Sequence, residues 1–109
     1  MNAAEEVERI RAIYPDAAPL VQGGQTFVHM PGLVIATRSG PVTRDALLCP
    51  HEHGGYKTRL FLSAAIAGPL ANWTEHNLFT RKWFTWSWNH ILAEQAWTSI
   101  LANHLAAFR

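Results

Sequence analysis

Apolar residues recur at helical spacing at both ends of the chain. Three of them lie three or four positions apart near its start: Val7, Ile10 and Tyr14. This spacing predicts an amphipathic helix over residues 3–14, with Asn2 as its N-cap and Pro15 as its stop. The same spacing over residues 93–108 predicts a second helix, which should cover a sheet with its apolar face and be anchored there by Trp97.

Between these helices, short apolar runs bounded by glycine and proline predict four β-strands. The runs occupy residues 26–30, 33–38, 45–49 and 58–66. A turn at Pro31-Gly32 separates the first two runs, which should therefore pair with each other. Residues 15–25 contain no such run, and we expect them to form a loop with a turn at Gly23-Gly24.

Residues 72–90 are crowded with aromatic side chains and follow neither a strand period nor a helix period. We expect an irregular segment with one short strand, whose tryptophans pack in a core or at a protein interface rather than against nucleotide bases. The predicted order is N-terminal helix, four-stranded antiparallel meander, aromatic-rich segment and C-terminal helix. This is an α+β layout, with residues 1–109 in a single domain.

Composition and charge narrow the environment and the partners. Apolar residues make up 49% of the chain and charged residues 16%, which is typical of a packed globular protein. The formal net charge is only +1, so neither nucleic acid nor an anionic membrane is expected as a partner. No glycine loop of the phosphate-binding type is present, and we expect no cofactor. The single cysteine and the charged N-terminus predict a cytoplasmic protein.

The densest candidate chemistry lies where Cys49, His51 and His53 alternate along the chain. If this stretch is extended, the three side chains point to one side and could bind a zinc ion together with a histidine of the aromatic segment. Alternatively, Cys49 is a nucleophile with one of the histidines as its base. The third interpretation is structural, because a free cysteine at the end of an apolar strand usually packs as a small buried side chain.

Three longer stretches carry a resemblance to a known family. They read MPGLVIAT, ALLCPHEHGGYKTRLFLS and NWTEHNLFTRKWFTWSWNHI. They resemble the ubiquitin-conjugating-enzyme-like (UBC-like) superfamily, in the prokaryotic group often called family E, over nearly the whole chain. The resemblance implies a UBC-like fold in which a first helix leads into a four-stranded meander and a Tyr-containing turn, here Gly55-Tyr56, precedes the last strand. It also implies a bacterial protein whose partners are a ubiquitin-like modifier and its adenylating enzyme.

The resemblance lacks one element, which is the catalytic centre of the superfamily. An active ubiquitin-conjugating enzyme has its thioester-forming cysteine after the fourth strand, near a His-Pro-Asn stretch. Here no cysteine follows Ile66, no Pro-Asn pair follows His76, and Lys57 stands where the turn proline is expected. Transfer of an activated acyl group requires a thiolate that is both a good nucleophile and a good leaving group, so the missing thiol favours a noncatalytic member.

Three functions remain open from the sequence. The favoured one is a UBC-like protein without the usual thioester cysteine, which binds a ubiquitin-like modifier, its adenylating enzyme, or both, through the sheet and the aromatic segment. The second is an active transferase with an unconventional catalytic site at Cys49, His53 and His76, in which His53 lies across the turn from His76. The third is a metal-binding accessory protein that uses Cys49, His51 and His53.

Overall fold

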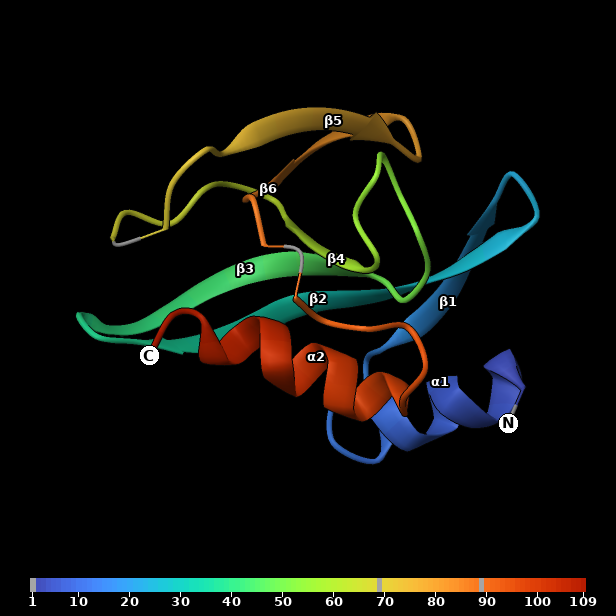
Figure 1. Ribbon diagram of the computed structural model, residues 1–109. Coiled ribbons are helices and arrows are strands. Elements are labelled where there is room, and N and C mark those ends of the chain that lie inside the picture. Colours follow the sequence, from blue (N-terminus) through green and yellow to red (C-terminus); the bar gives the residue numbers. More distant parts are fainter. Residues whose placement is uncertain (1, 69, 89) are drawn as a thin grey trace.

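The described part of the chain forms a helix, six strands and a second helix in that order (Figure 1). The computed structural model describes residues 2–68, 70–88 and 90–109. The elements are α1 (Ala3–Arg11), β1 (Ala18–Gln22), β2 (Gln25–Thr37), β3 (Gly40–Cys49), β4 (Arg59–Leu62), β5 (Thr74–Leu78), β6 (Arg81–Thr85) and α2 (Trp97–Ala106). The predicted α+β class with a helix near each end is confirmed. The predicted number of strands is wrong, since the described residues form a sheet of six.

The N-terminal helix α1 has the cap that the sequence predicts. Asn2 Oδ1 accepts a hydrogen bond from the backbone N–H of Glu5 at 2.9 Å. The helix ends at Arg11, earlier than predicted, because the next residues form a tight turn. In this turn the N–H of Tyr14 donates to the carbonyl of Ile10 at 2.8 Å, and the chain then enters the sheet.

A hairpin of β1 and β2 forms where the sequence predicts only a loop. Gly23 and Gly24 have φ values of +61° and +74°, the left-handed conformation that a type I′ hairpin turn requires. The predicted turn is therefore confirmed, and beyond it Leu20 pairs with Phe27 in antiparallel register. The apolar pattern does not show β1, because Pro19 interrupts the alternation of this short edge strand.

The predicted turn at Pro31-Gly32 is wrong, because β2 runs through it as one long strand. The pairs on either side of it, all with β3, are Met30 with Ala46 and Leu33 with Arg44. The two residues between them form a β-bulge, in which the N–H of Gly32 donates to Asp45 Oδ1 at 2.9 Å. The two predicted strands therefore do not pair with each other, since both pair with β3.

A further hairpin, of β5 and β6, lies in the segment that the sequence predicts to be irregular. Its turn is made by Phe79 and Thr80, which have φ values of +52° and +61°. Strand β6 also pairs with β4, at Leu62 and Phe84, so the strand order is β1-β2-β3-β4-β6-β5. The predicted four-stranded meander lacks this hairpin because its turn contains neither glycine nor asparagine, the usual sequence signals.

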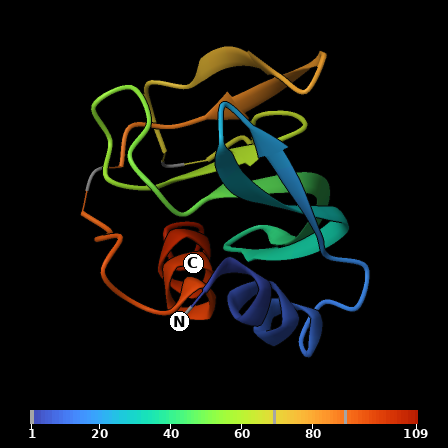
Figure 2. The same cartoon turned by 90° about the vertical axis from the view of Figure 1, so that its right-hand side faces the viewer.

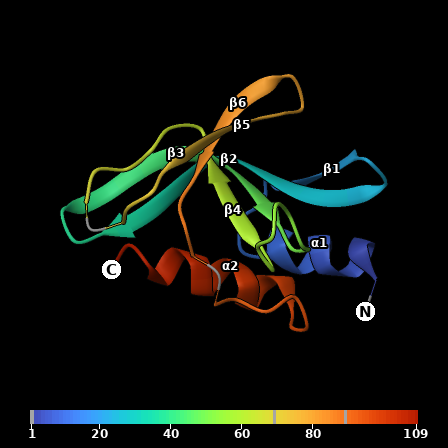
Figure 3. The same ribbon diagram turned by 45° about the horizontal axis from the view of Figure 1, so that its top comes forward.

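Two apolar clusters lie on opposite faces of the sheet. Helices α1 and α2 lie side by side beneath one face and cover the larger core, as expected for the C-terminal helix (Figure 2). The β5–β6 hairpin folds over the other face (Figures 1 and 3). There it closes a smaller group that we call the hairpin cluster: Phe27, Leu47, Cys49, Phe61, Leu78 and Trp83, with Leu20 and Phe79 packed against them.

The C-terminal helix α2 is shorter than predicted, and its anchor is different. Ile100, Leu101 and His104 are buried, whereas Trp97 is only half-buried. Trp97 is the first residue of the helix, and its backbone N–H donates to Glu6 Oε2 at 2.7 Å, which ties α2 to α1 at the rim of the core. Neither described helix has the length and apolar content to cross a membrane.

Candidate functional site

Histidine side chains gather on the sheet face that carries the hairpin cluster. The histidines whose rings meet aromatic rings of this cluster are His29, His51, His53 and His76. All four are half-buried, so each is partly accessible to solvent. This face combines titratable side chains with an apolar floor, a composition that is common in ligand-binding sites.

The turn before β4 positions His53 in this group. The backbone N–H of His53 donates to the carbonyl of Tyr56 at 2.8 Å, and the reverse bond measures 3.0 Å. Gly54 and Gly55 between them have φ values of +58° and +87°, as a type I′ turn requires. The bend that the two glycines predict is therefore confirmed, and it holds the imidazole of His53 over the hairpin cluster.

Cys49 ends strand β3 inside the hairpin cluster and has no exposed surface. Its Sγ donates to the backbone carbonyl of His51 at 3.3 Å and lies 3.4 Å from Nδ1 of the same residue. Burial raises the pKa of the Cys49 thiol to about 12, so the group stays protonated at neutral pH. Cys49 thus has a base within reach but neither the charge nor the access that a nucleophile needs.

His53 and His76 are brought together, although they lie on different sides of β4 in the sequence. Their ring centroids are 5.6 Å apart, and both rings stand edge-on to Phe61, at 5.3 and 5.5 Å. Burial, and after it the positive charge of Arg59, lowers the pKa of both histidines below the ordinary value. Both imidazoles are therefore neutral at physiological pH, so each can accept a proton and can donate one hydrogen bond through its N–H.

Arg59 belongs to this site, and the sequence reasoning above misses it. The residue is 6% exposed, and its guanidinium carbon lies 3.9 Å from the ring centroid of Tyr56. Its Nη1 donates to Nδ1 of His53 at 3.3 Å. The sequence feature that could have revealed Arg59 is the alternation of side chains along β4. It puts Arg59 on the same face as Phe61, which belongs to the hairpin cluster.

The structure does not support the alternative of a zinc site at Cys49, His51 and His53. His53 is turned toward Arg59 and Phe61, whereas the Cys49 thiol is occupied by His51. Across residues 2–68, 70–88 and 90–109, no three His, Cys, Asp or Glu side chains group so that they could hold a metal ion. The condition for this ligand set, an extended chain over residues 49–53, is not met, because the chain bends at His51, although all three side chains lie on the face of the hairpin cluster.

The tryptophans of the aromatic segment belong mainly to the core. Trp83 is buried in the hairpin cluster and Trp86 in the larger core. Trp73 is partly buried, with its ring centroid 5.3 Å from that of Trp86. The core interpretation of these aromatic residues is confirmed, and these three side chains do not form an exposed stacking platform.

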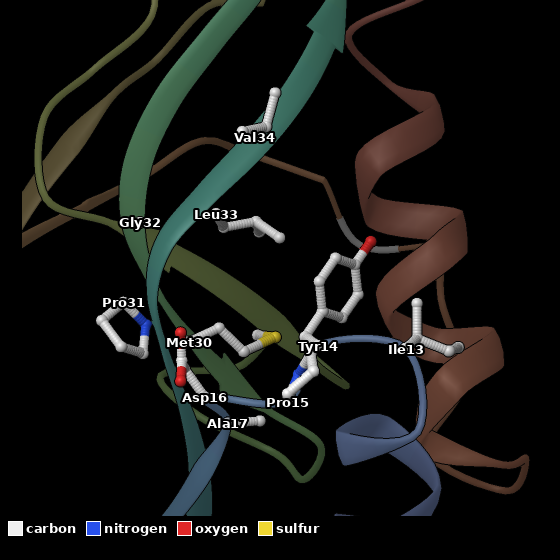
Figure 4. A pocket seen from close by; sticks show the side chains of 10 residues that line it. All are labelled: Ile13, Tyr14, Pro15, Asp16, Ala17, Met30, Pro31, Gly32, Leu33 and Val34. Carbon is white, nitrogen blue, oxygen red and sulfur yellow. The ribbon is translucent and has the colours of Figure 1, made fainter.

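A separate shallow pocket of about 210 Å³ lies between the α1–β1 connection and the bulge of β2 (Figure 4). Its floor includes Met30 and Leu33, and the side chain of Leu33 points toward Tyr14. Ile13 and Val34 at its edges are each 60% exposed, which is unusual for large apolar side chains. The pocket is suited to binding an apolar side chain of another protein.

The described residues thus form a titratable site around His53, Arg59 and His76, and an apolar one beside Ile13 and Val34. The two sites have no residue in common. No protein-family model, no curated protein and no solved structure matches this chain.

Proposed function

We propose that this chain is a UBC-like component of a ubiquitin-like conjugation system that carries no thioester. In this proposal it binds a ubiquitin-like modifier, its adenylating enzyme, or both. The assignment to such a system rests on the resemblance of the three sequence stretches. The order of helix, antiparallel sheet and helix is compatible with it, although six strands exceed the four of the superfamily's meander.

The noncatalytic role is carried by one observation, the burial of Cys49. The residue has no exposed surface, and burial raises the pKa of its thiol to about 12. A thioester at this position would require the thiol to leave the hairpin cluster and lose its proton before it met an acyl donor. Since the chain has a single cysteine, a binding role is the simpler consequence.

The proposed contact surface is the apolar pocket with its exposed edges. Val34 lies on β2 and Ile13 on the α1–β1 connection, so a partner would contact the sheet, as the sequence interpretation expects. The aromatic segment contributes less than expected, because Trp83 and Trp86 are buried. Exposed apolar side chains around a concave floor are typical of protein-binding surfaces.

The test uses purified chain, a ubiquitin-like modifier and an adenylating enzyme from the same genome, with ATP. We expect complex formation by size-exclusion chromatography and no thiol-sensitive adduct on a non-reducing gel. Val34→Glu should weaken the complex, because it places a charge at the edge of the pocket. Val21→Glu is the matched control, since Val21 is also a strand valine, is 65% exposed and lies outside the pocket.

Two outcomes would contradict this proposal in different ways. A thiol-sensitive adduct that is lost in Cys49→Ser would establish the alternative of an active transferase. An adduct that resists thiols but is lost in His76→Ala would indicate an acyl carrier other than cysteine. Equal binding by the Val34 and Val21 variants would leave the system in place but remove the pocket as its contact surface.

A further inference from the structure

Arg59 is a buried cation that has no counter-ion among the described residues. Only 6% of its surface is exposed. The ion pairs of the described residues involve other arginines and lysines, such as Arg81 with Asp45 and Lys82 with Glu75. A buried charge without an opposite charge is costly, and it persists only where something compensates it.

The contacts of Arg59 within the chain use only part of its hydrogen-bonding capacity. Nη1 donates to Nδ1 of His53, and the guanidinium lies over the ring of Tyr56. The Nε atom is buried and has no hydrogen-bond partner among the described residues. Oε1 of Glu52 accepts from the backbone N–H of Gly55 at 3.1 Å, and the ion pairs of the described residues do not include one between Glu52 and Arg59.

The other groups around Arg59 are neutral or potential cations. Because arginine can only donate, Nδ1 of His53 accepts its hydrogen bond, and the proton of the neutral His53 ring is on Nε2. The ring of His76 lies 5.6 Å from that of His53, and Nε2 of His76 lies 2.9 Å from Thr74 Oγ1. Three nitrogen-bearing side chains therefore converge where no carboxylate is paired with the arginine.

We propose that Arg59, His53 and His76 form a binding site for an oxyanion, either a phosphate group or a carboxylate. A planar guanidinium matches both anions in geometry, and its hydrogen bonds to them are among the strongest that proteins form. The two half-buried histidines form the solvent side of the site, and Nε2–H of His53 is a further donor. This site is independent of the proposed conjugation role, because it rests on these side chains alone.

The experiment follows the histidine ring signals of the whole chain by NMR over a pH series at constant ionic strength. The additives are inorganic phosphate, a short peptide with a free C-terminal carboxylate, the same peptide amidated, and chloride as the reference. A bound oxyanion stabilises the charged imidazoles, so the pKa of His53 and His76 should rise. His90, which is exposed and has no part in the site, should keep its pKa and is the internal control.

Variants separate the role of Arg59 from general charge effects. Arg59→Gln should weaken binding of the active additive by roughly tenfold or more, the usual consequence of losing charged hydrogen bonds. Arg81→Gln removes the same charge from an exposed arginine, which is paired with Asp45, and should change the affinity little. If Arg59→Gln does not fold, His76→Gln replaces it, because His76 is half-buried and its loss should also weaken binding.

The outcomes distinguish a phosphate ligand from a carboxylate ligand and test whether the oxyanion site exists. A response to phosphate alone assigns a phosphate ligand, and a response to the free peptide but not to its amide assigns a carboxylate ligand. A response to both supports a general oxyanion site. No response, an equal pKa change at His53, His76 and His90, or an equal affinity loss in the Arg59 and Arg81 variants would overturn the proposal.

Discussion

Thr58 and His104 form a buried hydrogen-bonded pair that joins α2 to the start of β4. The hydroxyl of Thr58 donates its single hydrogen to the carbonyl of Ile91 at 2.8 Å. Nε2 of His104, 2.9 Å from the same oxygen, must therefore be the donor in the second bond. His104 is 1% exposed, and burial lowers its pKa to about 4. The imidazole is thus a neutral core side chain, not a surface group.

This histidine should make folding sensitive to mild acid. Between its usual pKa of 6.5 and the folded-state pKa of about 4, the unfolded chain binds more protons at His104 than the folded chain does. The free energy of unfolding should therefore fall as pH falls through this range, by about 3 kcal/mol from this residue. Urea unfolding at a series of pH values measures the slope of the free energy of unfolding against pH.

The matched variant for this prediction is His104→Leu. It replaces the imidazole with an apolar side chain of similar size that cannot titrate, and it leaves the hydroxyl of Thr58 bonded to the carbonyl of Ile91. His53 and His76 also have lowered pKa values, and they contribute to the acid sensitivity of both proteins. The difference between the two slopes therefore isolates His104. Identical slopes would show that His104 is already charged, or already accessible, in the folded protein.

Single residues differ in how far the sequence reveals them. The burial of Cys49 follows from its place at the end of an apolar run, and the structure agrees. Arg59 is hidden from the same reasoning, because an arginine next to apolar residues usually extends to solvent. The alternation of β4 puts Arg59 on the face of Phe61, and the pairing of Cys49 with Arg59 across two strands shows that this face belongs to the hairpin cluster.

The bulge of β2 depends on one side chain of the neighbouring strand. Asp45 Oδ1 accepts the N–H of Gly32, and Oδ2 lies 3.3 Å from Nη2 of Arg81. The hydrogen bond from Gly32, and then Arg81, lowers the pKa of the Asp45 carboxyl despite partial burial. The bulge redirects β2 along the pocket, so Asp45 also supports the proposed contact surface.

Replacing Asp45 should therefore destabilise the protein through the bulge. We expect Asp45→Ala to lower the free energy of unfolding by about 1–2 kcal/mol, because the N–H of Gly32 loses its acceptor. Arg81→Gln should cost less than about 1 kcal/mol, since the ion pair is exposed. Equal losses in urea unfolding would assign the effect of Asp45 to the ion pair instead of the bulge.

The hairpins illustrate which elements short sequence signals can predict. Gly23-Gly24 and Gly54-Gly55 form the turns that their glycines predict, because glycine reaches positive φ without steric cost. Phe79-Thr80 also forms a turn at positive φ, and a β-branched residue is a genuine outlier there. Its conformation is imposed by contacts, such as the packing of Phe79 on Phe27 at 5.3 Å, which no local signal contains.

Over the whole molecule, stability depends on the core between the sheet and the two helices. Trp86 is 2% exposed there, and its ring lies 4.8 Å from that of Phe108 and 5.3 Å from that of Trp73. Trp97, which the helical pattern predicts as an anchor, is half-buried at the rim. The aromatic segment and the chain end are therefore held together mainly through Trp86.

The two tryptophans should respond differently to truncation. Trp86→Ala should lower the free energy of unfolding by roughly 3–5 kcal/mol, the usual loss for a large buried aromatic side chain. Trp97→Ala should cost about 1–2 kcal/mol, because the side chain packs against the edge of the core and is only partly buried. Guanidinium unfolding of both variants measures these losses. A larger loss for Trp97→Ala than for Trp86→Ala would show that Trp97, and not Trp86, is the main buried anchor.

The sequence by itself determined the two helices, most of the apolar strand residues between them and the Gly-Gly turns at 23–24 and 54–55. Each of these depends on residues within about one turn or one hairpin of each other, where spacing and φ preferences act directly. Tertiary structure alone decided the β5–β6 hairpin, the bulge at Gly32 and the meeting of Arg59 with His53 and His76. The hairpin turn packs on Phe27, the bulge is held by Asp45 of the neighbouring strand, and the site joins histidines on either side of β4, so each depends on contacts that no local sequence signal contains.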